Sequence, residues 1–446
     1  MQTLFSEQQL EDGEMAVSEK ILRSCVHCGF CTATCPTYLL EGDELDSPRG
    51  RIYLIKEMFE QGKPASGEIV KHIDRCLSCL ACMTTCPSGV HYMHLVDHAR
   101  AHIEATYDRP LGDRAMRALL AWILPHPRRF AAALRLASIV RPWAALLLPN
   151  LAGEAKKDPR LLDRLAALAA LTPRTAPPRT ASAARAFAAQ GRRRGRVVLL
   201  TGCTQSVLNP SINEAAIRLL NRNGIEVILP AGEGCCGALA HHMGRKDEAL
   251  VFARANVDAW SKAAAQGGLD AILITASGCG TTIKDYGFML RNDASYAEKA
   301  AEVSRQAKDI CEYLAELDLP TSEHTSGMTV AYHAACSLQH GQQITDLPKR
   351  LLRSAGFRVR DIPEGHICCG SAGIYNIMQP FFAQRLAARK LANIGKLHPD
   401  VVATGNIGCM MQLASGANIP IVHLVELMDW ANGGPAPLQI ETPRAR

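Results

Sequence analysis

The sequence predicts an α+β protein with a cysteine-rich helical part at the amino terminus, a helical linker and two repeated α/β lobes. Three observations support this prediction. Eight of the 17 cysteines fall within the first ninety residues, and the next one is Cys203. A stretch rich in Ala, Leu and Arg separates the two groups, and beyond it short apolar segments recur at a constant offset. We therefore expect at least three structural units.

Length and composition limit the kinds of protein that this chain can be. Its 446 residues correspond to about three average domains. No stretch reaches the roughly 18 to 20 uninterrupted apolar residues of a membrane-spanning helix, and the acidic segment 1–20 lacks a signal-peptide core. We expect a cytoplasmic protein whose cysteines hold metal or do redox work. The net charge of +6 is mild, and the basic run 192–196 is typical of a solvated linker, so no nucleic-acid partner is expected.

The strongest chemical signal is a pattern that occurs twice before residue 90, C-x2-C-x2-C-x3-C-P. Three thiolates at this spacing bend around three corners of a cubane, and the fourth, followed by proline, reaches the neighbouring cluster. Zinc ribbons, the alternative, favour separated C-x2-C pairs. His27 lies between ligands and is expected to be a packing or surface residue. The pattern predicts two 4Fe-4S clusters in a two-cluster ferredoxin-type domain, residues 1–110. The first is held by Cys25, Cys28, Cys31 and Cys86, and the second by Cys76, Cys79, Cys82 and Cys35.

Residues 111–195 are predicted to be a helical segment followed by a Pro- and Arg-rich linker. Apolar residues recur at helical spacing, and four prolines predict short helices with breaks between them: Pro125, Pro127, Pro142 and Pro149. Apolar residues and arginines alternate around Trp122 and Trp143. This alternation favours ordinary amphipathic packing, with contact to a membrane surface or a partner subunit as the second interpretation. The composition from 172 to 195 marks a domain boundary.

Beyond the linker the chain repeats itself. Apolar segments 196–203 and 328–336 end at a cysteine, and a second pair of segments, 225–230 and 357–363, leads to a Cys-Cys-Gly triplet. The offset between the copies is 133 residues at both cysteine positions, which is too regular for chance. A third pair of segments, 270–275 and 400–404, also ends near a cysteine, and helices 310–317 and 424–430 close the copies.

Strands separated by helices form parallel βαβ units, so we expect two α/β lobes, residues 196–320 and 326–440. Their cysteines should gather at the carboxyl ends of the strands, where such sheets hold ligands. Four cysteines in each lobe suggest a polynuclear cluster or a redox-active thiol site, with buried structural cysteine as the alternative. The candidates are Cys203, Cys235, Cys236 and Cys279 in the first lobe and Cys336, Cys368, Cys369 and Cys409 in the second.

A glycine pattern and four histidines also lie near the triplets. Residues 232–237 satisfy G-x-G-x-x-G, but the sister segment 364–370 keeps the cysteines and loses the glycine spacing. The segment also follows the second strand of its lobe instead of the first, so a dinucleotide site is not expected. Ordinary surface histidines, and not cluster donors or proton relays, are expected at four nearby positions: His241, His242, His333 and His366.

At the level of whole segments, the chain resembles a known family. Residues 21–38, 42–56 and 76–89 closely resemble the iron-sulfur subunit of bacterial glycolate oxidase, and the resemblance extends over essentially the whole chain. Wider relatives include the iron-sulfur subunits of lactate-utilisation and anaerobic glycerol-3-phosphate dehydrogenase complexes and the cysteine-rich subunit of heterodisulfide reductases. In the fullest Cys-Cys-Gly pattern each copy ends in C-x-x-C, whereas here Ala276 and Asn406 replace its first cysteine. The five-thiolate, non-cubane cluster of heterodisulfide reductases is therefore not carried over to the lobes, whose cysteines stay candidates.

This resemblance implies an electron-transfer subunit of a 2-hydroxy acid oxidoreductase, with no substrate site or catalytic residue of its own. Its partners would be two flavoprotein-type subunits, one of which holds FAD and oxidises glycolate to glyoxylate. Electrons would pass on to a quinone-type acceptor, which implies peripheral contact with the inner face of the cell membrane. The same role in a lactate or glycerol-3-phosphate complex is the alternative, and a non-catalytic iron-sulfur regulator or scaffold is a third.

Overall fold

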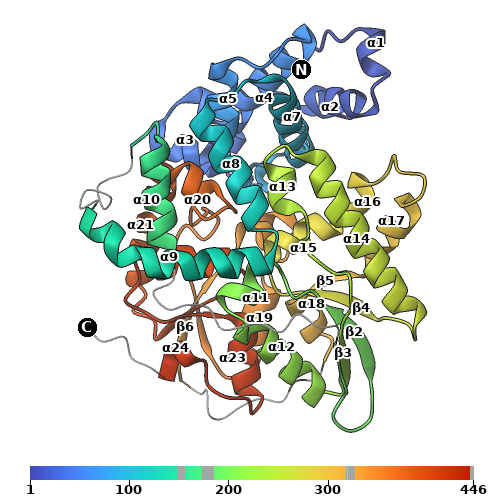
Figure 1. Cartoon of the computed structure of the whole chain (residues 1–446), viewed down its shortest axis with the longest axis vertical. Helices are drawn as coiled ribbons and strands as arrows, with labels where there is room; N and C mark the ends of the chain where they lie inside the picture. The colour runs from blue at the N-terminus through green and yellow to red at the C-terminus, as the bar shows by residue number, and fades with distance from the viewer. Residues whose placement is uncertain (148–155, 173–184, 318, 320–326, 442–446) are drawn as a thin grey trace.

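The computed structural model describes residues 1–147, 156–172, 185–317, 319 and 327–441. A helical amino-terminal domain sits at one end of two α/β lobes (Figure 1), which confirms the predicted fold class. Within the described ranges, every helix is too short or too polar to cross a membrane.

The amino-terminal domain is built from four longer helices and short helical turns that carry the cysteines. Helix α4 shows why they form: Ser47 caps its first turn by accepting from the Gly50 N–H, and Pro48 occupies the first helical position. Buried side chains such as Phe59 and Leu95 fill the core between the helices. The elements are α1 (Glu7–Leu10), α2 (Gly13–Ser24), η1 (Phe30–Thr34), α3 (Pro36–Glu41), η2 (Glu44–Asp46), α4 (Pro48–Gln61), α5 (Gly67–Asp74), α6 (Ala81–Thr85) and α7 (Tyr92–Thr106).

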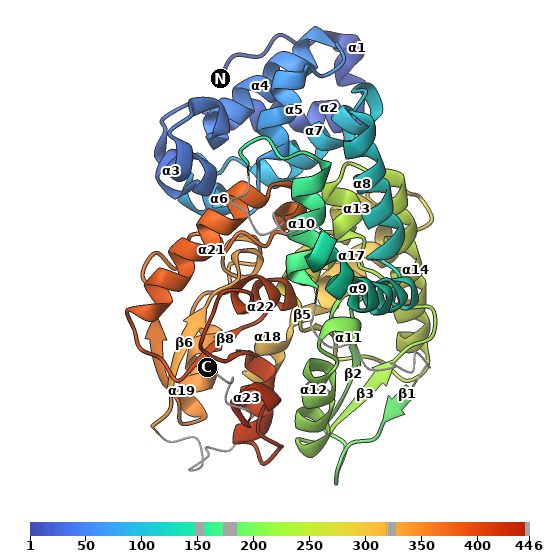
Figure 2. The same cartoon turned by 60° about the vertical axis from the view of Figure 1, so that its left-hand side comes forward.

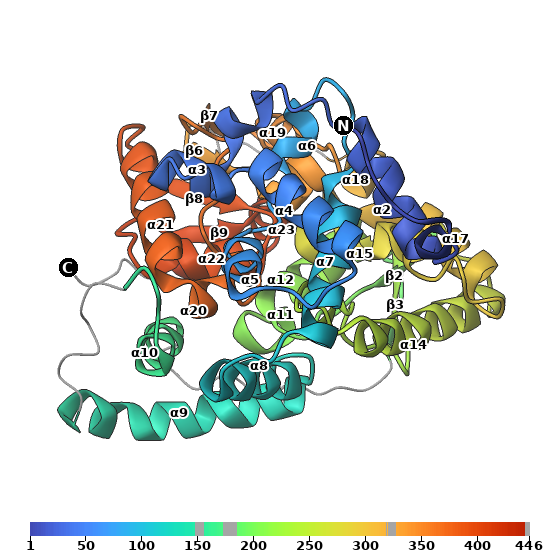
Figure 3. The same ribbon diagram turned by 90° about the horizontal axis from the view of Figure 1, so that it is seen from above.

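Three helices follow along one side of the molecule (Figure 3): α8 (Leu111–Ile123), α9 (Pro127–Leu147) and α10 (Leu161–Leu171). The predicted break at Pro142 is wrong, because α9 continues through it. A proline removes only one helical N–H, and a helix can accommodate this loss with a kink. The chain does break between α8 and α9, so Pro127 begins a helix. The side chain of Trp143, and all of Pro149 and 173–184, lie outside the described residues.

Each of these helices has a packed face and an exposed one. Met116 and Leu120 of α8 pack against Ile377 and Met378 of the second lobe, whereas Trp122 is 58% exposed. The preferred interpretation of amphipathic packing therefore holds for the inner face of α8.

The two lobes contain sheets of the same topology. The first sheet has the strand order β1-β3-β2-β4-β5 and the second β7-β6-β8-β9, so the orders coincide once β1 is set aside. All neighbouring strands are parallel except β1 and β3. The first sheet consists of β1 (Arg185–Phe187), β2 (Gly195–Leu199), β3 (Ile225–Leu229), β4 (Ala271–Ile274) and β5 (Ala307–Asp309). The second consists of β6 (Thr329–His333), β7 (Arg358–Asp361), β8 (Val401–Thr404) and β9 (Ile421–His423).

Helices on both faces complete each lobe. In the first lobe they are α11 (Gln205–Leu208), α12 (Ser211–Arg222), α13 (Ala238–His242), α14 (Lys246–Ala265), α15 (Ser277–Lys284), α16 (Tyr286–Met289), α17 (Ala297–Gln306) and α18 (Ile310–Leu314). In the second they are η4 (Ser337–Gly341), α19 (Leu347–Ser354), α20 (Tyr375–Met378), α21 (Pro380–Gly395), α22 (Ile407–Ala414), α23 (Leu424–Ala431) and α24 (Leu438–Glu441).

The lobes pack face to face through equivalent helices. Helix α12 of the first lobe packs against α23 of the second, and α19, the counterpart of α12, packs against α18, the counterpart of α23. One continuous apolar core spans both lobes. At its edge, Arg218 of α12 donates to buried Asp429 of α23 over 2.7 Å. The repeats therefore form one unit related by an approximate twofold arrangement.

The amino-terminal domain covers the ends of the lobes where the cysteines lie. Helix α6 contacts η4, α3 contacts α21, and α7 contacts α13. Figure 2 shows the domain resting across both lobes. The loops that carry the first eight cysteines thus face the Cys-Cys-Gly segments.

Candidate metal centres

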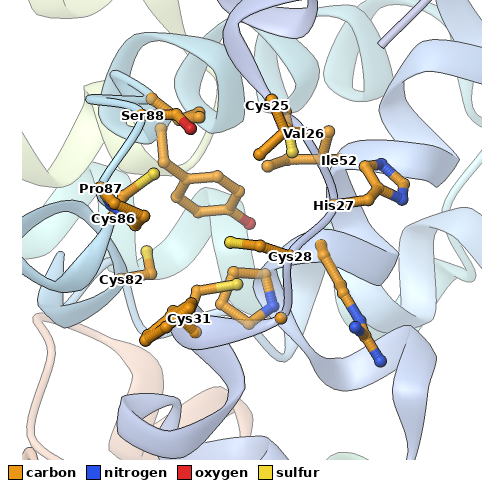
Figure 4. Close-up of a pocket in the computed structure, with 16 residues that line it drawn as sticks. Cys25, Val26, His27, Cys28, Cys31, Ile52, Cys82, Cys86, Pro87 and Ser88 are labelled. Carbon is orange, nitrogen blue, oxygen red and sulfur yellow. The ribbon is translucent and has the colours of Figure 1, made fainter.

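The first predicted ligand set lines one cavity. Cys25, Cys28, Cys31 and Cys86 all border it, together with Cys82 (Figure 4). Cys25, Cys28 and Cys31 come from the first motif, and Cys82 and Cys86 come from the second. The structure therefore brings together the four cysteines of the first predicted cluster from both motifs.

The second ligand set lines a neighbouring cavity, formed by Cys35, Cys76, Cys79 and Cys82 among other residues. Here Cys35 is the one contributor from the first motif. Cys82 borders both cavities, so the two spaces are adjacent. Each ligand set thus contains the last cysteine of the other motif, which is the arrangement expected of a two-cluster ferredoxin domain.

The two motif loops share an unusual backbone conformation. His27 and Gly29 in the first loop, and Ser78 and Leu80 in the second, all have positive φ angles at matching places of the motif. Residues other than glycine rarely adopt this conformation, so surrounding contacts must hold it. Gly29 has a φ of +84°, a conformation that glycine adopts without strain. These turns aim successive thiols inward.

The chemistry of the donor set fits a cation that binds thiolates. Burial raises the pKa of the Cys31 thiol to about 11. Burial, together with neighbouring thiols, also raises the pKa of Cys79 and Cys82 well above the ordinary value. Without metal these thiols stay protonated at neutral pH, and iron would displace the protons because the thiolate is the ligand.

A buried polar network supports the second cavity. Arg51 donates from Nη1 to the Cys35 sulfur over 3.7 Å, and the Tyr92 hydroxyl donates to the Cys76 sulfur over 3.7 Å. Burial pushes the pKa of Asp46 upward. The hydrogen bond from His72 and the charges of Arg51 and its neighbour Arg75 outweigh burial, so the pKa of Asp46 lies below its usual value. The Asp46 carboxylate therefore stays charged and fixes Arg51.

The two cavities differ in their exposure. Cys28 is exposed, and Val26 and Phe30 beside it are 65% and 64% exposed. The second cavity is covered by the second lobe, where Leu77 packs with Cys336 and Cys368. Thr84 Oγ1 also lies 2.8 Å from Nδ1 of His340 on η4. The first cavity is thus nearer to solvent, and the second is nearer to the lobe thiols.

The first lobe brings its four candidate cysteines into one row. Cys203 and Cys235 have their sulfurs 3.6 Å apart, and Cys236 and Cys279 continue the row. The Tyr286 hydroxyl and the Asn256 amide hold the triplet backbone by donating to the carbonyls of Cys236 and Cys235.

The second lobe repeats the row with Cys336, Cys368, Cys369 and Cys409. His333 joins them: one ring nitrogen lies within 4.8 Å of the sulfurs of Cys369 and Cys409. Burial and the charge of Lys390 lower the pKa of His333 to about 3, so the ring is neutral at pH 7.

The structure also explains residues that the sequence left ambiguous. A Cβ on Gly237 would lie 2.8 Å from the Ala249 carbonyl oxygen, and one on Gly370 would lie 2.6 Å from that of Ala383. The triplet glycines therefore allow a helix to pack closely against the loop that carries the two cysteines.

Of the four histidines near the triplets, three are at least partly exposed and one, His333, is buried. His241 and His242 pair with buried Asp97 of α7, and His366 is half-buried. The expectation of a surface residue is wrong for His333, which is 1% exposed because it ends the inner strand β6. Sequence reasoning also missed Lys390, a cation buried on the inner face of α21 with no sequence signal beyond its helical position.

Comparisons with known proteins agree with this geometry. A 4Fe-4S dicluster domain model matches residues 21–90, and a Cysteine-rich domain model matches twice, over 197–284 and 330–414. The fold and these sites define an iron-sulfur electron-transfer protein with a dicluster domain and two cysteine-rich domains. Iron-sulfur clusters of the predicted 4Fe-4S type are thus its cofactors.

Over 436 residues the chain is 41% identical to the glycolate oxidase iron-sulfur subunit of Escherichia coli, with 97% of this chain and 99% of that protein covered. It is 29% identical over 445 residues to a probable glycolate oxidase iron-sulfur subunit of Bacillus subtilis, with 97% of each chain covered. The chain belongs to the family of glycolate oxidase iron-sulfur subunits, as the resemblance predicted.

More distant similarities are informative about parts of the chain. Lactate utilization protein A of Bacillus licheniformis is 23% identical over 241 residues, 52% of this chain and 99% of that protein. A crystal structure of a hypothetical protein from Helicobacter pylori aligns with a TM-score of 0.52 and 11% identity, covering 97% of this chain and 76% of that one. The latter supports the fold alone.

Proposed function

We propose that this chain carries electrons from a partner flavoprotein, which oxidises glycolate to glyoxylate on FAD, towards a quinone-type acceptor. The observation that carries the proposal is the meeting of four cysteines from both motifs at each of two adjacent cavities, in a member of the glycolate oxidase iron-sulfur family. Two 4Fe-4S clusters would supply one-electron steps there.

The ligands in this proposal follow the two sets. Cys25, Cys28, Cys31 and Cys86 would hold the first cluster, and Cys76, Cys79, Cys82 and Cys35 the second. We propose the same four domains as the sequence predicts, with the bounds 1–110, 111–195, 196–320 and 326–440.

The chain's own residues position and tune these centres. The exposed Cys28 edge is where electrons exchange with a partner, because tunnelling favours the shortest approach to a cofactor. Arg51 and Tyr92 donate to sulfurs of the second set, and such donors stabilise the reduced, more negative state of a cluster. The second lobe packs over that set through Cys336 and Cys368.

The partners proposed are two flavoprotein-type subunits, with the complex in the cytoplasm and peripheral on the inner face of the cell membrane. The same role with lactate as the partner's substrate is the alternative, supported by the similarity to lactate utilization protein A. Glycolate is preferred because the sequence identity to the glycolate oxidase iron-sulfur subunit is higher, and that alignment covers 97% of this chain. Glycerol 3-phosphate, and a regulator or scaffold role, rank below both.

The test replaces Cys79 with serine in the assembled complex. Glycolate-dependent quinone reduction should be lost, while glycolate still reduces the flavin of the partner. The matched control is Cys311→Ser, because Cys311 is buried but lies in neither motif. If the Cys79 variant loses both activities although the complex assembles, the proposal is wrong.

A further inference from the structure

His333 is the least explained polar side chain of the second lobe. It is 1% exposed, and within the described part of the chain neither ring nitrogen has a hydrogen-bond partner. Leaving a buried polar group unpaired destabilises the folded state, because its hydration is lost without replacement. Such a group therefore points to a ligand that satisfies it.

The neighbours of His333 identify the kind of ligand. One ring nitrogen and the sulfurs of Cys369 and Cys409 all lie within 4.8 Å of one another, and all three residues are buried. Ligand atoms in a tetrahedral zinc-class site lie about 3.5–3.8 Å apart, since each metal–ligand bond is about 2.0–2.3 Å. The three atoms are gathered closely enough for one ion to draw them to that spacing, whereas a cubane spreads its thiolates over separate irons.

The first lobe lacks this arrangement. The residue that occupies the position of His333, 133 residues earlier, is Leu200, an apolar side chain that offers no ligand atom. Cys236 and Cys279 are the counterparts of Cys369 and Cys409, so the lobes differ in the nitrogen donor and not in these two thiols. The first lobe can therefore serve as a control for the second, because it has the two thiols without the histidine.

A buried cation balances the thiolates of the proposed site. Lys390 is 2% exposed, and the thiols of Cys336, Cys368 and Cys369 lie close enough to act on its charge. Its ammonium donates to the Glu364 carbonyl over 2.7 Å, which fixes its place. A positive side chain at this depth favours a site that carries excess negative charge, as several thiolates around one divalent ion do.

We propose that the second lobe binds a single zinc-class divalent ion through His333, Cys369 and Cys409, and that the first lobe does not. Binding converts the two thiols to thiolates and releases their protons to solvent, with no change of oxidation state. Cys368 and Cys336 continue the row of sulfurs and can complete a tetrahedral site. The ion would brace the face on which the loop of Cys79 rests.

The test measures zinc and iron in the full chain, purified without oxygen after growth with both metals and then exposed to Zn²⁺. Wild-type protein should hold about one zinc per chain. His333→Leu, which installs the residue of the first lobe, should lose at least nine-tenths of it, and so should Cys409→Ser. Cys279→Ser, the matched change in the first lobe, should keep the zinc.

A conservative exchange separates ligation from misfolding. His333→Cys supplies a thiolate in place of the imidazole and should retain zinc, with X-ray absorption showing a nitrogen neighbour replaced by sulfur. Zinc that survives His333→Leu, or a lobe that takes up only iron, would overturn the proposal. The iron of the amino-terminal domain is counted in the same samples, so failure here is distinguishable from failure of the proposed function.

Discussion

The Arg51 guanidinium donates to the sulfur of Cys35 over 3.7 Å from a side chain that is 2% exposed. The same guanidinium bonds Thr37 and Asp46, so its position is fixed on several sides. A buried cation held against a cluster ligand is a means of setting reduction potential, because it stabilises added negative charge in a medium of low dielectric.

Replacing Arg51 with glutamine should therefore lower the reduction potential of the second cluster. The variant loses both a positive charge and a donor to sulfur, so the reduced state is stabilised less. A redox titration followed by electron paramagnetic resonance measures the shift. The signal of the first cluster serves as the internal control, and an unchanged or higher potential of the second cluster would contradict the prediction.

Tyr92→Phe tests the effect of a neutral donor on the same cluster. It removes only the hydroxyl that donates to Cys76 over 3.7 Å and keeps the buried ring. The potential should fall in the same direction but by less than in Arg51→Gln, because no charge is lost. Tyr53→Phe, on a half-exposed ring outside this contact, should leave the potential in place.

If each cluster takes its fourth cysteine from the other motif, serine variants of the two motifs should fall into pairs that differ from those expected if each motif held its own cluster. Cys35→Ser should disturb the spectroscopic signal that Cys79→Ser disturbs, although Cys35 belongs to the first motif. Cys86→Ser should instead match Cys28→Ser. The opposite pairing of these four spectra would show that each motif holds its own cluster alone.

The triplet glycines should be intolerant of a methyl group. Gly370 has a φ of +90° and a Cβ there would lie 2.6 Å from backbone oxygen, so Gly370→Ala should lower the free energy of unfolding by about 1–3 kcal/mol or more. Gly395→Ala, in a helix with open space around it, should be neutral or stabilising by up to about 1 kcal/mol. Denaturant titration compares the two variants, and equal stability would refute the packing role.

Docking of the amino-terminal domain should weaken as pH rises. Burial alone would lower the pKa of His241, but the charge and hydrogen bond of Asp97 outweigh it and raise the pKa. A histidine whose pKa is raised on folding contributes stability that is fully present below its unfolded value, about 6.5, and is lost as pH rises through the folded value.

Thermal unfolding of the wild type should therefore lose more stability than that of His241→Gln as the pH rises above about 6.5. His102→Gln, which removes a histidine of α7 whose ring lies against Phe59 and the Lys63 carbonyl and not beside Asp97, is the control and should follow the wild type. Parallel pH profiles for wild type and His241→Gln would contradict the prediction.

The parts that could be predicted from the sequence are those with a repeating signal. The paired cysteine runs and the constant offset between Cys203 and Cys336 were enough to predict the fold class and the gathering of thiols at strand ends. Strands of three residues such as β5 and β9 were missed, because no periodicity can show in so short a segment that runs directly into a helix. β1 was missed because its Ala- and Arg-rich surroundings are typical of a linker.

Other features depend on tertiary structure. Nothing in the local sequence of Lys390 or His333 indicates that the side chain is buried beside thiols, since burial there comes from the layers that cover the sheet. Pro142 shows the reverse case, in which a strong local signal for a helix break gives way to helix continuation. The placement of the amino-terminal domain over both lobes likewise comes from contacts between distant segments.

The central claim, that the first eight cysteines hold two electron-carrying clusters, is tested most directly by combined iron analysis and electron paramagnetic resonance of protein purified without oxygen. We predict about eight irons in the amino-terminal centres per chain, and signals from two interacting clusters after reduction with dithionite. A protein that remains colourless, holds only zinc and stays silent after cluster reconstitution would contradict the account.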